Sequence, residues 1–380
     1  MESSLMPHAP LKAVYQPSHD EAARQAFVGA LKTHLNGPLE ARLARRFEEE
    51  VEPAFVAEHG RPPVNREEGT EAFRGDNLFQ LWGSAVFASQ DLMWETVDET
   101  CNRLFPEFEA RRQLLAKKDA RGRLELNRDL VLPEPIRHVE IHRQPGGYFG
   151  QPGDTSLRQG MGYLGSGEIY MAAKGIAVGG KAGEPGRGRF IVDVLRRRFS
   201  DTSPVSILDL GCGAGIQTIA YKQAFPEAQI WGVDLSAPFL TFAHTWAEDQ
   251  GLAINYRQAD ARSTGFADGQ FDLIVSHILF HETWHDIVPG IMQEAHRLLA
   301  PGGIFLNADT PFQPDRLSMP GQVTNHWQVV NNGEPFWTGY ADTDMREALI
   351  QAGFAAERVF ADYEPMGGGE FHIFGGRKAA

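Results

Sequence analysis

The segment that most constrains this chain is 205–215, which reads Val-Ser-Ile-Leu-Asp-Leu-Gly-Cys-Gly-Ala-Gly. An apolar run ends at the carboxylate of Asp209, and glycines then follow at alternate positions: Gly211, Gly213 and Gly215. Glycine tolerates turns and close approaches that a Cβ atom forbids. Residues 216–225 can then form a helix whose first N–H groups face a ligand. We therefore predict a buried strand, a tight turn and a nucleotide-type pocket.

The glycine spacing departs from that of a typical dinucleotide site. Such a site usually has the pattern G-x-G-x-x-G, with an acidic residue about 20 positions further on. Here the third glycine comes one residue early and Ile216 follows it. An isolated glycine-rich turn is a weak signal, because many proteins use one only to tighten a strand–helix connection. An NAD-type oxidoreductase therefore stays an alternative, although the spacing disfavours it.

The residues downstream alternate between strand and helix patterns. Two expected strands end in acidic residues, Asp234 and Asp260. The expected strands are 229–234, 254–260, 271–276 and 303–307, with 371–374 as a closing edge strand, and the expected helices are 236–250, 287–299 and 342–352. This alternation predicts an α/β fold with a parallel sheet and helices on both faces.

Five ordered motifs now resemble those of class I S-adenosylmethionine-dependent methyltransferases, over residues 205–380. The motifs are Asp209–Gly215, Gly232-Val-Asp-Leu-Ser236, Ala259-Asp-Ala261, Phe271-Asp-Leu-Ile-Val-Ser276 and Leu298-Leu-Ala-Pro-Gly-Gly303. The resemblance implies a Rossmann-like core with a mostly parallel seven-stranded sheet. It also implies S-adenosyl-L-methionine as the cofactor.

The resemblance assigns the cofactor-binding residues one by one. Gly211, Gly213 and Gly215 would surround the methionine part, and Asp209 would orient polar groups or the cofactor's ammonium. Asp234 would hold the ribose, while Asp260 and Ala261 would hold the adenine. Leu235 and Ser276, from the same motifs, complete the expected set. Each carboxylate has a structural alternative, in which it ends a strand or caps a helix.

Composition favours a soluble cytoplasmic enzyme. No apolar run reaches the roughly 18 residues that span a bilayer, and the first residues lack the pattern of a signal peptide. Two cysteines, Cys101 and Cys212, cannot build a disulfide framework. A net charge of −14 disfavours a nucleic-acid partner. We expect a small-molecule substrate, no nucleic acid and no membrane.

The first 140 residues are predicted to form a helical domain. Leu39, Leu43, Phe47, Val51 and Phe55 recur at every fourth position, with Pro38 suited to a helix start and Pro53 to a kink or an end. A second apolar pattern covers 76–104. This domain would cover the active site, mediate a homodimer or only stabilise the core.

Residues 141–200 are predicted to connect this domain to the methyltransferase domain, 201–380, and to cover the cofactor. The stretch 144–189 is so rich in glycine and proline that we expect no regular structure there. It also contains Tyr148, Phe149, Tyr163 and Tyr170. Aromatic side chains on a flexible backbone suit a loop that closes over a ligand. Tyr163 and Tyr170 are the predicted cofactor contacts, and a packing role is the alternative.

The reaction chemistry is expected just after the strand 271–276. His281-Glu-Thr-Trp-His285 matches the zinc motif H-E-x-x-H, but that motif needs one continuous helix and a third ligand. We therefore expect no metal. His281 is the preferred base, Glu282 the second and His277 a third candidate, since histidine can accept a proton near neutral pH. The alternative is that these residues only cap the helix and hold the loop.

The segment 309–337 is a candidate second wall for the substrate. It contains His326-Trp327 and Asn331-Asn332-Gly333-Glu334-Pro335-Phe336-Trp337. Aromatics beside amides and a carboxylate suit a small polar ligand, and they equally suit a packed surface loop.

The whole pattern predicts direct in-line methyl transfer from S-adenosylmethionine to a small-molecule acceptor. The acceptor atom, whether oxygen, sulfur, carbon or nitrogen, stays open, as does the need for a base. A non-catalytic, cofactor-binding scaffold is the second alternative.

Overall fold

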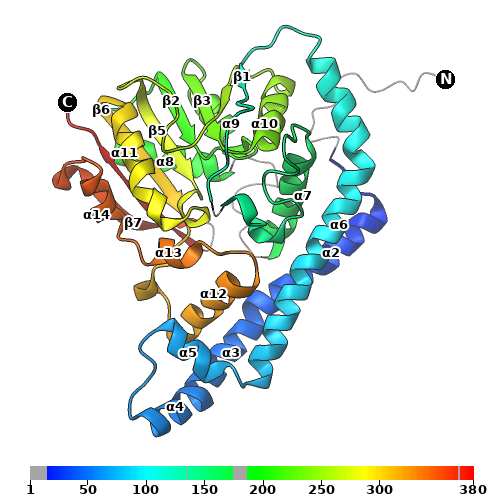
Figure 1. The fold of residues 1–380 in the computed structure, drawn as a ribbon, viewed down its shortest axis with the longest axis vertical. Helices are drawn as coiled ribbons and strands as arrows, with labels where there is room; N and C mark the ends of the chain where they lie inside the picture. The colour runs from blue at the N-terminus through cyan, green and yellow to red at the C-terminus, as the bar shows by residue number, and fades with distance from the viewer. Residues whose placement is uncertain (1–14, 135, 174–185, 367–368) are drawn as a thin grey trace.

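The structure, a computed structural model, describes residues 15–134, 136–173, 186–366 and 369–380. Its centre is one sheet of eight strands: β1 (Leu124–Glu125), β2 (Ser206–Leu210), β3 (Gln229–Asp234), β4 (Asn255–Gln258), β5 (Phe271–His277), β6 (Leu299–Asp309), β7 (Val359–Met366) and β8 (Gly369–Arg377). The strand order is β1-β4-β3-β2-β5-β6-β8-β7 (Figure 1). β8 runs antiparallel to β6 and β7, whereas all other neighbours are parallel.

The predicted α/β class and mostly parallel sheet are confirmed. The resemblance implied seven strands, of which six were predicted by their residues; β7 is the seventh, and β1 adds a two-residue strand beside β4. The prediction that 371–374 closes the sheet as its edge is wrong, because β8 lies between β6 and β7. The edge strand is β7, whose mixed apolar and charged residues are mostly half-buried and gave no clear strand pattern.

Alternation along the strands builds a hydrophobic core on each face of the sheet. Successive strand residues point to opposite faces, so Ile207 and Leu208 pack into different clusters. The Ile207 cluster contains residues of α7 (Arg158–Ala173), α8 (Gly186–Arg198), α9 (Ile216–Ala224) and α10 (Ala237–Asp249). The Leu208 cluster contains residues of α11 (Val288–Leu298), α13 (Trp337–Ala341) and α14 (Met345–Gln351).

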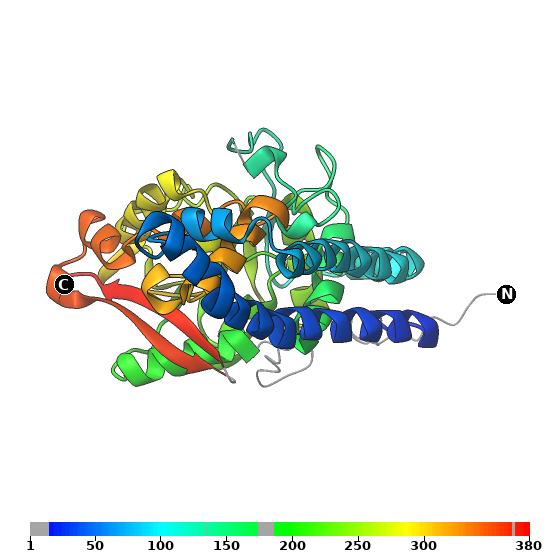
Figure 2. The ribbon, with the colours of Figure 1, turned by 90° about the horizontal axis from the view of Figure 1, so that it is seen from below.

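The N-terminal region is helical, as expected. Its helices are α2 (His19–His34), α3 (Glu40–Arg46), α4 (Glu52–His59), α5 (Arg66–Phe73) and α6 (Asn77–Leu115). Figures 1 and 2 show α2 and α6 side by side along one flank of the molecule. The predicted helix start at Pro38 is wrong, because Pro38 lies in a π-helical turn, Leu35–Leu39, that joins α2 to α3. The wider turn accommodates a ring that clashes with an α-helical backbone. Another π-helical turn, Phe47–Val51, precedes Pro53 and α4.

The N-terminal helices share a hydrophobic core with the sheet. Met93, Trp94 and Val97 of α6 belong to the same buried cluster as Phe242 and Trp246 of α10. On the other side, the predicted loop after β6 contains a helix, α12 (Met319–Asn331), whose Trp327 packs edge-on against Trp82 of α6. The boundary predicted at residue 140 therefore falls within one packed unit.

The glycine-rich stretch 144–189 is more regular than its composition predicts. Four of its glycines lie within helix α7, at 160, 162, 165 and 167. A Cβ atom at Gly160 would lie 2.2 Å from Cγ of Phe242, and one at Gly165 would lie 1.9 Å from the Tyr15 hydroxyl. Close packing against neighbouring elements thus overrides the low helix propensity of glycine. Residues 174–185 of this stretch lie outside the described residues.

This packing predicts opposite effects for two alanine substitutions in α7. Gly160→Ala should lower the free energy of unfolding by about 1–3 kcal/mol, because the added methyl overlaps the Phe242 ring. Gly167→Ala, where no atom lies within 4 Å of the new Cβ, should raise it by roughly 0.5–1 kcal/mol through helix propensity. Urea unfolding followed by circular dichroism measures both. Equal stabilisation by the two substitutions would show that α7 and α10 are not in close contact.

Candidate active site

A pocket lies at the carboxyl ends of β2, β3, β4 and β5, where parallel α/β sheets bind their ligands. Ten of the predicted site residues line it: Tyr163, Asp209, Gly211, Gly213, Asp234, Leu235, Asp260, Ala261, His277 and Glu282. Four predicted residues do not line it: Tyr170, Gly215, Ser276 and His281. The pocket thus joins most of the expected cofactor residues to two of the three expected catalytic ones.

The glycine loop forms one wall of the pocket. Gly211, Gly213 and Gly215 all have positive φ, at 69°, 51° and 75°. The Gly213 N–H donates to Oδ2 of Asp234 at 2.9 Å, which ties the loop to the end of β3. Gly215 instead begins α9, and a Cβ there would lie 2.6 Å from Cβ of Ala243. Gly215 therefore packs against α10, and it lies outside the pocket lining where we predicted a cofactor contact.

The three acidic residues of the pocket differ in their electrostatic environment. Asp209 accepts a hydrogen bond from Oγ1 of Thr218 at 2.6 Å, and burial raises its pKa to about 7. Burial also raises the pKa of Asp234, although backbone N–H groups oppose the shift. Partial burial alone would raise the pKa of Asp260, but hydrogen bonds from Arg262 outweigh burial and hold this pKa below its usual value.

Aromatic side chains from the segment 141–200 line the pocket. Tyr148, Phe149 and Tyr163 line it beside Phe239 of α10. The Ser236 hydroxyl caps α10 by accepting the Phe239 N–H, and it donates to the Tyr148 carbonyl at 2.5 Å. One serine therefore joins this segment to the cofactor end of β3.

Two further predicted cofactor contacts lie behind the pocket wall. The Tyr170 hydroxyl accepts a hydrogen bond from the Gln90 side chain of α6. Ser276 is fully buried, and its hydroxyl bonds to the Asn307 side chain of β6. Each of these two hydroxyls hydrogen-bonds to a buried side chain, where we had predicted a contact with the cofactor.

His281 is not suited to the role of base that we preferred for it. Its Nδ1 contacts the Asp309 carboxylate, and its Nε2 lies 3.2 Å from Oε1 of Glu282. Burial alone would lower the pKa of His281, but the two carboxylates raise it to about 10. An imidazole that is already protonated at neutral pH cannot accept a proton. Asp309 ends β6, and no local pattern predicted this pairing.

Glu282 faces the pocket and contacts two histidines. Besides His281, His142 Nε2 lies 2.9 Å from Oε1 of Glu282, and the Tyr148 hydroxyl donates to the same oxygen at 3.4 Å. Burial would raise the pKa of Glu282, but His142 and His281 outweigh it and hold the pKa well below its usual value. Glu282 is therefore an anion at neutral pH.

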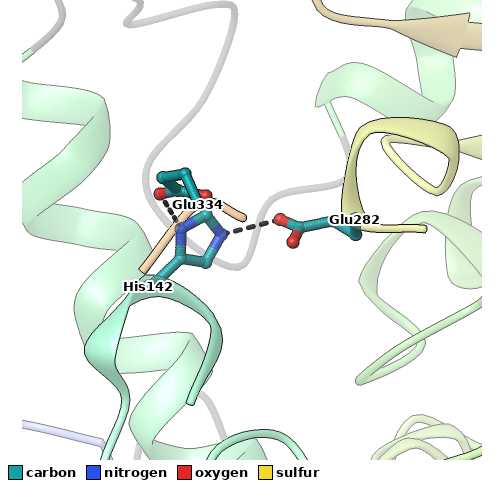
Figure 3. Close-up of side chains that lie close together, drawn as sticks. All are labelled: His142, Glu282 and Glu334. Carbon is teal, nitrogen blue, oxygen red and sulfur yellow. Dashed lines mark hydrogen bonds and ion pairs between the residues drawn. The ribbon is translucent and has the colours of Figure 1, made fainter. Parts of the chain in front are cut away.

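His142 and Glu334 are site residues that the sequence did not reveal individually. His142 Nδ1 lies 2.5 Å from Oε1 of Glu334, so the imidazole bridges two carboxylates (Figure 3). Glu334 lies in the segment 309–337, which the sequence marked only as a candidate wall. His142 stands between unremarkable neighbours, and no motif signals it.

The backbone of His142 is held in an unusual conformation. Its φ of 55° is uncommon for a residue other than glycine. Its carbonyl accepts hydrogen bonds from Gln90 and Trp94 of α6 at 2.6 and 2.7 Å, and its N–H donates to the Gly333 carbonyl at 2.8 Å. Such strained conformations persist where the surroundings over-determine them, often at functional sites. Helix α6 therefore positions His142 for its contact with Glu282.

The H-E-x-x-H motif does not form a zinc-protease helix. Two short 3₁₀ turns, Phe280–Glu282 and His285–Ile287, are separated by the extended residues Thr283 and Trp284. His281 is buried, whereas His285 is exposed beside Asp286. The two histidines therefore do not share one helix face.

Comparisons with known proteins agree with this geometry. Residues 207–303 match a family model described as a methyltransferase domain. The demethylmenaquinone methyltransferase of Thermus thermophilus is 34% identical over 123 residues, which are 31% of this chain and 55% of that protein. The malonyl-[acyl-carrier protein] O-methyltransferase of Xylella fastidiosa is 33% identical over 142 residues, 36% of this chain and 45% of that protein.

The chain spans about half the length of each of these relatives. The matched family segment runs from β2 through the glycine loop to the start of β6. It contains Asp209, Asp234 and Asp260, at the strand ends where the pocket opens. The chain therefore carries a methyltransferase domain over residues 207–303, and the matches support a class I, S-adenosylmethionine-dependent methyltransferase.

Proposed function

We propose that this protein transfers the methyl group of S-adenosylmethionine to a small-molecule acceptor. The observation that carries the proposal is one continuous pocket, which runs from Asp234 and Asp260 to His277 and Glu282. The first pair belongs to the cofactor motifs, whereas His277 ends β5 and Glu282 lies in the turn after it. A pocket with both ends can hold donor and acceptor together.

The cofactor end of the pocket supports the roles implied by the family. Asp209 and Gly213 would contact the methionine part, Asp234 the ribose, and Asp260 with Ala261 the adenine. The sulfonium carbon is already electrophilic, so alignment of donor and acceptor is the main task of the protein. Tyr148 and Phe149, which lie over the pocket, would exclude water from the reacting atoms.

Glu282 would orient the acceptor. Its ionised carboxylate faces the pocket and can accept a hydrogen bond from an acceptor O–H or N–H group. His281 and His142 would act through Glu282 by fixing its position and charge.

Calorimetry with S-adenosylmethionine, S-adenosylhomocysteine and NAD tests the cofactor. We expect both S-adenosyl compounds to bind and NAD to show no heat, because the glycine spacing and Asp260 do not suit a dinucleotide. Tight NAD binding without S-adenosyl binding would overturn the proposal. A metabolite screen with labelled methyl donor then separates an enzyme from a non-catalytic scaffold, which would stay silent.

The raised pKa of Asp209 predicts that cofactor affinity depends on pH. Below pH 7 the buried carboxyl is protonated in the unliganded fold, so pairing with the cofactor's ammonium first requires loss of a proton. The Kd for S-adenosylhomocysteine should therefore fall by up to about tenfold per pH unit from pH 5.5 to 7, and then level off. Asp209→Asn should flatten this profile in calorimetry, and an unchanged slope would remove Asp209 from the binding site.

The proposed partners and location follow from surface features. Several large apolar side chains of the N-terminal helices are exposed, among them Phe27 of α2 (64%) and Leu81 of α6 (61%), and homodimerisation through these helices would cover them. Light scattering of the purified chain tests this.

Arg197 and Arg198 pair with Asp362 and Glu364 of β7, which leaves less of this basic run for nucleic acid. None of the described helices has the length and hydrophobicity that crossing a bilayer requires. A cytoplasmic location stays a proposal.

A further inference from the structure

Three side chains with metal-binding atoms converge at one wall of the pocket. His142, Glu282 and Glu334 each offer one donor atom, and these atoms lie within 4.8 Å of one another. The three residues come from separate segments: a turn before α7, the turn after β5 and the loop between α12 and α13. Donors bound to one cation at about 2.1 Å are at most about 4.2 Å apart. The three donor atoms are therefore close to the spacing of one coordination sphere. Because one ring nitrogen of His142 would bind the ion, the carboxylate that now contacts the other ring nitrogen would turn toward it.

One oxygen of this group has no partner within the described part of the chain. Oε1 of Glu334 contacts His142, but Oε2 is buried and makes no hydrogen bond with any described residue. The Glu334 side chain is only 5% exposed. Burying a carboxylate oxygen without a partner is unfavourable. Figure 3 shows the carboxylates of Glu282 and Glu334 both directed at the His142 ring, so the unpartnered oxygen belongs to the same small space.

The charge and chemistry of the three side chains fit a divalent cation. An ion that binds a histidine displaces the ring proton, and two carboxylates with the resulting neutral imidazole carry a charge of −2, which a divalent ion neutralises. Imidazole favours first-row transition metals, whereas carboxylates also accept Mn²⁺. The backbone contacts of His142 with Gln90, Trp94 and Gly333 hold this ligand in place before any ion arrives.

We propose that His142, Glu282 and Glu334 bind one divalent first-row transition-metal ion beside the methyl-transfer pocket. This ligand set shares only Glu282 with the H-E-x-x-H motif, and it replaces the expectation that the chain has no metal site. Glu282 also lines the pocket, so open positions on the ion would be available to an oxygen atom of the acceptor. That last role rests on the proposed function, whereas ion binding itself does not.

The test uses the full chain after treatment with a chelator and removal of the chelator. Titrations with Mn²⁺ and, separately, with Zn²⁺ are followed by calorimetry, and electron paramagnetic resonance reports free Mn²⁺. We expect one ion per chain. Glu334→Gln and His142→Gln should each weaken binding at least about tenfold, because each removes a ligand.

A matched control is available on the surface. Glu134 and His138 form an exposed pair, with Nε2 of His138 3.0 Å from Oε2 of Glu134. Glu134→Gln makes the same chemical change there and should leave the affinity for the ion unchanged. Circular dichroism and S-adenosylhomocysteine binding check the fold of each variant, since Glu334 and His142 do not line the pocket. If one of the two variants does not fold, the other carries the test.

The outcomes separate the two proposals. Wild-type protein that binds S-adenosylhomocysteine but neither ion would refute the metal site and leave the methyltransferase proposal standing. Equal ion affinity in the wild type and in the folded ligand variants would also refute it. Ion binding that is lost in these variants and kept in Glu134→Gln supports the site, even if S-adenosylhomocysteine does not bind.

Discussion

Replacing Glu282 by glutamine is expected to lower the kcat of methyl transfer by about 10²-fold or more, while the Kd for S-adenosylhomocysteine changes less than about threefold. The carboxylate faces the pocket beyond the cofactor residues and is the point where His142, His281 and Tyr148 converge. Glutamine keeps the shape but loses the charge that orients the acceptor. A misplaced acceptor alone costs on the order of 10²-fold in rate.

The measurement is the rate of transfer from labelled S-adenosylmethionine to an acceptor found by the metabolite screen. His281→Asn is the informative companion, because His281 does not line the pocket and would act only by positioning Glu282. His281→Asn should lower kcat by a smaller factor than Glu282→Gln does. A larger loss for His281→Asn than for Glu282→Gln would restore His281 as the group that contacts the acceptor.

Replacing Asp234 by asparagine is expected to raise the Kd for S-adenosylhomocysteine by about 10²-fold, which corresponds to roughly 2.7 kcal/mol. Two effects add. A carboxylate can accept hydrogen bonds from both ribose hydroxyls, and bonds to charged groups contribute about 1.5–3 kcal/mol each. Asp234 also accepts the Gly213 and Ser236 N–H groups, so its loss loosens the glycine loop and the cap of α10.

Calorimetry on the folded variant checks this expectation. Asp268→Asn is the matched control, because Asp268 is a highly exposed carboxylate outside the pocket. It should bind S-adenosylhomocysteine like the wild type. A Kd for Asp234→Asn within about threefold of the control would mean that this carboxylate caps the strand end and does not hold the ribose.

The N-terminal helices contribute to the site more directly than a cover would. Gln90 and Trp94 of α6 hold the carbonyl of His142, and Trp82 of α6 packs on Trp327 of α12. The loop that carries Glu334 follows α12. The same helix therefore supports the segments on both sides of the His142–Glu334 contact. Glu282 lies within the matched family segment, whereas His142 and Glu334, which flank it, lie outside that segment and depend on α6 and α12 for their positions.

Much of the cofactor end could be predicted because its signals are local. The glycines at 211 and 213 and the carboxylates at 209, 234 and 260 all lie within three residues of the end of a strand, and parallel strands bring their carboxyl ends together. Predictions failed where a long-range contact decided the outcome. Gly160 and Gly165 predicted irregular structure, but they lie in a helix because Phe242 and Tyr15 pack closely against them. Ser276 was predicted to contact the cofactor, but its hydroxyl hydrogen-bonds to the Asn307 side chain.

The sequence by itself determined the α/β class, the course of the parallel strands and the cofactor family, since each depends on residues close together in the chain. Only the tertiary structure decided which groups meet at the catalytic end. His142 and Glu334 are 192 residues apart, and His281 and Asp309 are 28 residues apart. Their contacts arise from the packing of α6, the turn after β5 and the loop after α12. Such convergence leaves no periodic or motif signal, because it depends on how whole elements pack and not on the spacing of residues within one.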